Sequence, residues 1–64
     1  MKYFEIYEER AAIMQYDGEL TKSEAERKAL IDTKNLIMDE NGITNPETYN
    51  FISKLNKQIK QNGQ

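Results

Sequence analysis

The residues that most often carry out chemistry in proteins are missing from this chain of 64 residues or lie apart in it. The chain contains no histidine and no cysteine, so neither a Ser-His-Asp nor a Cys-His arrangement can form within one copy. The same absence excludes disulfides and thiolate metal sites. The three glycines are isolated from one another, so no glycine-rich phosphate-binding loop is present. These absences predict a protein that is not an enzyme and holds no cofactor.

Carboxylates are the remaining candidates for chemistry. Asp17 and Glu19 flank Gly18, and the segment Asp39-Glu40-Asn41-Gly42 has a faint likeness to a calcium-binding loop. That segment lacks the alternating ligand positions and the closing bidentate Glu of such a loop. A turn and a helix end explain the two segments more simply, so we predict no metal site.

A row of lysines near the C-terminus is the best candidate for contact with nucleic acid. Lys54, Lys57 and Lys60 recur every three residues after Tyr49, a spacing that places them along one strip of a helix. No acidic residue follows Glu47, so this end of the chain is basic. The net charge of −2 argues against a dedicated nucleic-acid binder, and lysines are common on solvated helix faces. Nucleic-acid binding through these lysines and Tyr49 is therefore the alternative function.

The elements that position these residues are predicted to be three helices, of which the first covers residues 2–16. This segment contains no Gly or Pro, and its apolar residues recur at helical spacing. The resulting face comprises Tyr3, Ile6, Tyr7, Arg10, Ile13 and Met14. We expect the aliphatic stem of Arg10 to cover the core while its guanidinium pairs with a nearby Glu. After Asp17, Gly18 is expected to adopt the left-handed conformation that closes many helices.

The second helix is predicted over residues 22–40. Thr21 and Glu24 have the spacing of a capping box at its start. Gly42 followed by Ile43 has the pattern of a Schellman turn at its end. Both ends of this helix are therefore well marked.

Apolar residues occupy two faces of the second helix. The broad face comprises Ala25, Ala29, Leu30, Thr33, Leu36 and Ile37. Ile31 and Met38, one heptad apart, project from a different side. A helix with two apolar faces is either the middle element of a bundle or partly exposed to a partner.

The third helix is predicted over residues 46–60, with Asn45 as its N-cap and Pro46 at its first position. Its apolar stripe comprises Thr48, Phe51, Ile52, Leu55 and Ile59. Residues 61–64 are expected to fray. Residues 1–64 are thus predicted to form a single all-α domain, a small three-helix bundle.

Because a chain this short can form only a small hydrophobic core, we predict that the domain is stabilised by a partner. A chain of this length buries only about 60% of the surface that its unfolded form exposes. Four of the six aromatic residues lie within residues 2–16, and we expect most of them to fill the core or its rim. Tyrosine is also enriched at interface anchors. We therefore predict a partner-binding surface formed by Tyr3, Tyr7, Ile31 and Met38.

The chain has no segment that resembles a membrane span or an export signal. Its longest apolar run, residues 11–14, is far shorter than a membrane-spanning helix. The start Met1-Lys2-Tyr3-Phe4-Glu5 does not have the pattern of a signal peptide. We expect a cytoplasmic protein that does not enter a membrane.

Residues 9–26, with the sequence ERAAIMQYDGELTKSEAE, resemble a short helical element in proteins of bacterial prophages and plasmids. There the element typically reads E-R-A-A-I-x-E-Y/F-D-G-G-L-S/T-R-x-E-A-E, often in a tail attached to primase- or helicase-like replication proteins. This chain departs from the element at Gln15 and at Glu19, which replaces the second glycine. The resemblance covers under a third of the chain and includes no catalytic residues, so what it implies is an origin in a mobile element.

Two functions follow from the residues and the resemblance together. The first is a small non-enzymatic protein of a phage or mobile element that binds a host or phage protein. It would act as a replication accessory factor or as an inhibitor of a host machine, such as a defence system. The alternative is a nucleic-acid-associated regulator that uses the basic face of the third helix. A homodimer is possible in either case.

Overall fold

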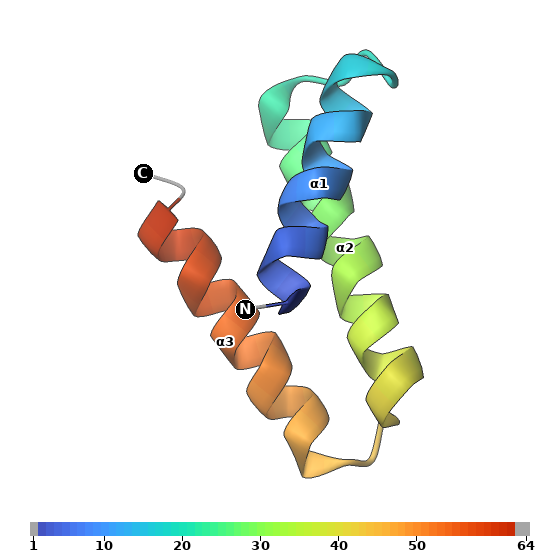
Figure 1. Ribbon diagram of the computed structural model, residues 1–64, viewed down its shortest axis with the longest axis vertical. Helices are drawn as coiled ribbons and strands as arrows, with labels where there is room; N and C mark the ends of the chain where they lie inside the picture. The colour runs from blue at the N-terminus through green and yellow to red at the C-terminus, as the bar shows by residue number, and fades with distance from the viewer. Residues whose placement is uncertain (1, 63–64) are drawn as a thin grey trace.

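The computed structural model describes residues 2–62, which form three α-helices (Figure 1). They are α1 (Lys2–Tyr16), α2 (Lys22–Asn41) and α3 (Pro46–Asn62). The predicted all-α, three-helix fold is confirmed for these residues. α2 continues through Asn41, and α3 continues through Gln61 and Asn62, where we had expected fraying. The expectation for residues 63–64 lies outside the described residues.

The helices are arranged as a hairpin with a third helix that diverges from it. α1 and α2 run antiparallel along each other, whereas α2 and α3 open into a V whose angle holds the N-terminal half of α1 (Figure 1). The molecule measures 35 × 23 × 16 Å along its principal axes. Since one helix with its side chains is about 10 Å across, the shortest dimension has no room for helices on both sides of α2. One flank of the hairpin therefore faces solvent.

The core lies where the three helices meet. It comprises Tyr3, Phe4, Tyr7, Ala29, Ile37 and Leu55. The Tyr3 and Phe51 rings meet edge to face, with centroids 5.4 Å apart and an interplanar angle of 66°, a geometry that aromatic quadrupoles favour. The fully buried Ala25 and Ala29 on α2 have small side chains, which let α1 approach closely.

The start of α2 confirms the predicted capping box. The Glu24 N–H donates to Thr21 Oγ1 at 3.2 Å, and the Thr21 N–H donates to Glu24 Oε1 at 3.4 Å. These bonds satisfy two backbone donors that the helix geometry leaves without an intrahelical partner.

The turn after α1 corrects the prediction made for Gly18. The left-handed residue is Glu19, with φ 55°, and not Gly18. A Cβ at position 18 would lie only 2.7 Å from the carbonyl oxygen of Met14, which accepts a hydrogen bond from the Gly18 N–H at 3.1 Å. Glycine is thus required at this position because the backbone passes close to the last turn of α1, and not because of its φ angle.

The junction between α2 and α3 is fixed by a compact set of hydrogen bonds. Gly42, at φ 88°, donates its N–H to the Met38 carbonyl at 2.8 Å. The buried hydroxyl of Thr48 donates to the Gly42 carbonyl, and the Glu47 N–H donates to Asn45 Oδ1 at 3.0 Å. The first turn of α3 is therefore tied to the C-terminal cap of α2, which sets the direction in which α3 leaves.

Candidate protein-binding site

The structure divides the partner-binding surface that the sequence predicted. Tyr3 and Tyr7 are only 7% and 6% exposed, whereas Ile31 is 53% exposed and Met38 is partly exposed. The structure thus places Tyr3 and Tyr7 mainly in the core, and their role at an interface stays a prediction. α1 turns the side that carries these rings toward α2 and α3, where they supply most of the aromatic core.

Tyr3 also has a polar structural role. Its hydroxyl donates to Glu40 Oε1 at 2.7 Å and accepts from Asn41 Nδ2 at 3.1 Å, while the same amide nitrogen donates to the Ile37 carbonyl at 2.9 Å. The hydrogen bond to Glu40 and, next, burial raise the pKa of the Tyr3 phenol. These bonds tie the start of α1 to the last turn of α2.

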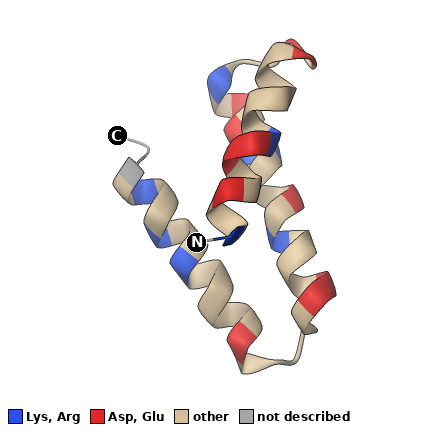
Figure 2. Cartoon of the chain, viewed as in Figure 1, with Lys and Arg blue, Asp and Glu red and all other residues tan. Residues whose placement is uncertain are grey.

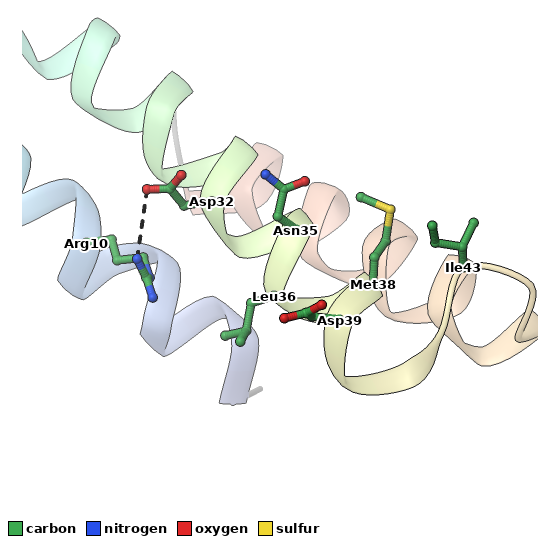
Figure 3. A pocket seen from close by; sticks show the side chains of 7 residues that line it. All are labelled: Arg10, Asp32, Asn35, Leu36, Met38, Asp39 and Ile43. Atoms are coloured by element: carbon green, nitrogen blue, oxygen red, sulfur yellow. Dashed lines mark ion pairs between the residues drawn. The ribbon is translucent and has the colours of Figure 1, made fainter.

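Another part of the α1–α2 hairpin carries an open groove. One part of it has a volume of about 510 Å³ and is shown in Figure 3. Its lining residues are Arg10 from α1, then Asp32, Asn35, Leu36, Met38 and Asp39 from α2, and Ile43 from the following loop. Met38 near the end of α2 and Ile43 in the following loop both line this groove.

A second hollow of about 440 Å³ extends the groove along α1. It is lined by Ile6, Glu9, Arg10, Ile13 and Leu36. Because Arg10 and Leu36 belong to both hollows, the two form one surface, which we call the α1–α2 groove. Ile13 and Ile43 are 51% and 65% exposed, so this surface offers large aliphatic side chains to solvent.

Electrostatically, the α1–α2 groove has an excess of negative charge. Arg10 Nη1 lies 3.8 Å from Asp32 Oδ2 across the groove (Figure 3). The partner of Arg10 is thus on α2, and not a nearby Glu as predicted. Glu9, Asp32 and Asp39 against Arg10 give the lining a formal charge of −2. The last turn of α2, which holds Asp39, contains no basic residue, and the carbonyls at a helix C-terminus add to the negative potential.

The sequence contained a signal for this groove that we interpreted differently. Ile6, Arg10 and Ile13 were predicted to lie on the core face of the first helix, and Leu36 on that of the second. In the fold the Phe4 and Tyr7 side of α1 is buried most deeply, and Ile6 and Leu36 pack against the core as predicted, whereas Arg10 and Ile13 lie at the surface. The charged Arg10 within the apolar stripe of α1 was the signal that this edge of the stripe is exposed.

The predicted basic strip lies elsewhere, on α3. Tyr49 is 59% exposed, and Lys54, Lys57 and Lys60 are also exposed. Figure 2 shows the basic positions along the C-terminal half of α3. No residue that lines the α1–α2 groove belongs to α3, so the groove and the basic strip are separate surfaces.

Two further classes of site were sought among residues 2–62. In this part of the chain no three acidic side chains come close enough together to hold a metal ion. None of its helices has the length and apolar character needed to cross a membrane.

Comparison with known proteins gives no family. No protein-family model matches the chain, and no curated protein or solved structure is significantly similar to it. The site must therefore be interpreted from its own geometry.

Proposed function

We propose that this chain is a small protein-binding module without enzymatic activity of its own, and that the α1–α2 groove is its contact surface. One observation carries the proposal: Ile13 and Ile43 are more than half exposed in a groove that Leu36 and Met38 also line. Contiguous exposed apolar surface marks interaction sites in soluble proteins.

The energetics of burial support this assignment. Moving one large aliphatic side chain fully out of water contributes about 1.5–3 kcal/mol. The domain leaves several such side chains in solvent although its core has few large members. A partner that covered the α1–α2 groove would supply the burial that the chain cannot supply itself.

The resemblance of residues 9–26 to a prophage and plasmid element supports a more specific version of the proposal. In that version the module acts in a phage or other mobile element, in the host cytoplasm. It binds a host or phage protein, either as a replication accessory factor or as an inhibitor of a host machine such as a defence system.

The test is an affinity capture from a bacterial lysate treated with nuclease, using three baits. They are the unchanged chain, the double variant Ile13→Lys with Ile43→Lys, and the control Tyr49→Lys, which alters an equally exposed residue on α3. We expect the unchanged chain and Tyr49→Lys to retain the same protein and the double variant to lose it. Circular dichroism checks that all three baits are folded.

Two results would contradict the proposal. One is a protein retained equally by all three baits, because the groove would then not be the contact surface. The other is recovery of nucleic acid alone in a parallel capture from lysate without nuclease, which would favour the alternative function.

The exposure of the basic strip supports that alternative, a nucleic-acid-associated regulator. Lys54, Lys57 and Lys60 lie exposed on α3 without an acidic residue after Glu47. Binding through phosphates would weaken steeply with salt. Titration of fluorescent duplex DNA and single-stranded RNA at low salt tests this function. A change in fluorescence anisotropy that disappears when all three lysines are changed to Glu supports this function. The absence of any change for the unchanged chain contradicts it.

A further inference from the structure

We infer that the occupant of the α1–α2 groove is an amphipathic helix from another protein, with basic residues beside its apolar face. The inference rests on the proposed protein-binding function and specifies its partner. Three features of the groove carry it: its shape, its charge and its mismatch with a second copy of this chain.

The shape of the groove suits a helix. It lies between two antiparallel helices on the side that α3 leaves uncovered, so a partner helix there would pack against both. From Asp32 to Asp39 the lining on α2 spans roughly 10 Å at about 1.5 Å per residue, or about two helical turns, and Ile43 in the following loop extends it. A helix in such a groove inserts apolar side chains that recur at i, i+3 or i+4, and i+7. Ile13, Leu36, Met38 and Ile43 would receive them.

The charge of the groove selects a basic helix. Arg10 is paired with Asp32 across the groove, so the excess charge is carried by Glu9 and Asp39 at its two sides. Asp39 lies at the negative end of α2, in a turn without a basic residue. A Lys or Arg on the partner would therefore gain both from the carboxylate and from the helix terminus.

The same charges disfavour a second copy as the occupant. A symmetric contact between two α1–α2 grooves would bring together two surfaces that each carry −2, and like charges across an interface oppose association. The basic face of α3 has the right charge, but Tyr49 is the one large hydrophobic residue exposed on α3 within the described part of the chain. That face has too few apolar side chains to fill the groove.

The experiment uses two synthetic peptides and the full chain labelled with ¹⁵N. Both peptides are helices of about 14 residues with the same leucine stripe, and they differ in having Lys or Glu beside it. Each is titrated into the chain and followed by amide chemical shifts. The variant Asp39→Lys is compared with Asp17→Lys, a control with the same change of net charge in the exposed turn after α1.

We expect the Lys peptide to shift the amides of Arg10, Leu36, Met38, Asp39 and Ile43. Asp39→Lys should weaken its binding about tenfold, the effect of replacing one attraction by a repulsion, while Asp17→Lys leaves it nearly unchanged. The Glu peptide should bind Asp39→Lys better than the unchanged chain.

Each other outcome overturns a defined part of the inference. Equal binding of both peptides removes the basic preference, while the proposed function still stands on the capture experiment. Binding of neither peptide, or shifts confined to α3, rules out a helix in the groove. Groove shifts that depend on the concentration of the chain alone identify a second copy as the occupant. The proposed function is contradicted by a separate result, namely that the double variant Ile13→Lys with Ile43→Lys captures the same protein as the unchanged chain.

Discussion

At the residue scale, the turn after α1 carries local strain. Glu19 has φ 55°, a conformation in which the Cβ of an L-residue crowds the backbone at a cost of about 1–2 kcal/mol. The neighbouring Gly18 has the opposite need, because its place is too close to the Met14 carbonyl for any side chain.

We predict that Glu19→Gly stabilises the protein by about 0.5–1 kcal/mol, the relief of strain less the added freedom of glycine in the unfolded chain. Gly18→Ala should destabilise it by about 1–3 kcal/mol, because the new Cβ must displace backbone. Urea denaturation followed by circular dichroism measures both changes. Glu19→Ala is the control, since it removes the charge and keeps the Cβ. If it stabilised as much as Glu19→Gly, charge and not φ would be the cause.

Two buried tyrosines make stability depend on pH in the alkaline range. The pKa of Tyr3 is raised by its hydrogen bond to Glu40 and then by burial, and the pKa of Tyr7 is raised mainly by burial and then by the charge of Glu26. Both phenols thus ionise more easily in the unfolded chain. Their contribution to stability is complete below the ordinary pKa of 10.0 and is lost as the pH rises through the raised folded values.

We therefore predict that the free energy of unfolding falls as the pH rises above about 10, and that Tyr3→Phe and Tyr7→Phe each make this fall less steep. Urea midpoints at a series of alkaline pH values measure it. Tyr16→Phe, at an exposed position, is the matched control and should keep the slope of the unchanged chain. Parallel slopes for all variants would show that these phenols do not cause the dependence.

At the element scale, α3 is held by fewer contacts than the α1–α2 hairpin. Its attachment depends on Leu55, which is fully buried, on the contact between Phe51 and Tyr3, and on the hydrogen bond from Thr48 to the α2 cap. Since Leu55 shares one core with Ile37 and Tyr3, a change on α3 is felt by all three helices.

We predict that Leu55→Ala costs about 2–5 kcal/mol, the sum of lost burial and the cavity left behind. In a domain of this size such a loss is a large share of the total stability, so the thermal midpoint should fall by more than about 10 °C. The control is Ile31→Ala, at a half-exposed position on α2, which should stay within about 0.5 kcal/mol. Equal losses for the two variants would show that the burial of Leu55 does not hold α3 in place.

At the scale of the whole molecule, charge is divided along the chain. Residues 1–20 carry −3 and residues 48–64 carry +3. The fold does not cancel this division, because the α1–α2 groove and the basic strip of α3 form separate surfaces. The molecule therefore presents one acidic, partly apolar surface and one basic, polar surface.

We predict that the isolated chain is a monomer of 7.5 kDa at physiological salt. Two grooves that meet would have like charges, and a groove that meets the basic strip would find few apolar side chains on the other side. Sedimentation equilibrium measures this, and a series of salt concentrations serves as the internal control. A dimer that persists at high salt would contradict the prediction. A dimer that forms only at low salt would indicate pairing of the acidic and basic surfaces.

The local signals in the sequence were sufficient to predict the helices. The capping box at Thr21 and Glu24, and Asn45-Pro46 before α3, both specify contacts within a few residues, and the structure confirms them. The apolar stripe of α3 was also predicted correctly, since Thr48 and Leu55 are buried and the three lysines of the basic strip are exposed. These features depend on interactions whose range is one helical turn, so a single sequence contains them.

The tertiary structure alone decided which part of each stripe became core. The apolar stripe of α1 is wider than its neighbours can cover, and rotation about the helix axis chose Tyr3, Phe4 and Tyr7 over Arg10 and Ile13. That rotation depends on close packing against Ala25 and Ala29 of α2 and on contacts with α3, which join residues far apart in the chain. The sequence determined three helices and an all-α domain, whereas the packing of those helices decided that the exposed apolar surface is the α1–α2 groove.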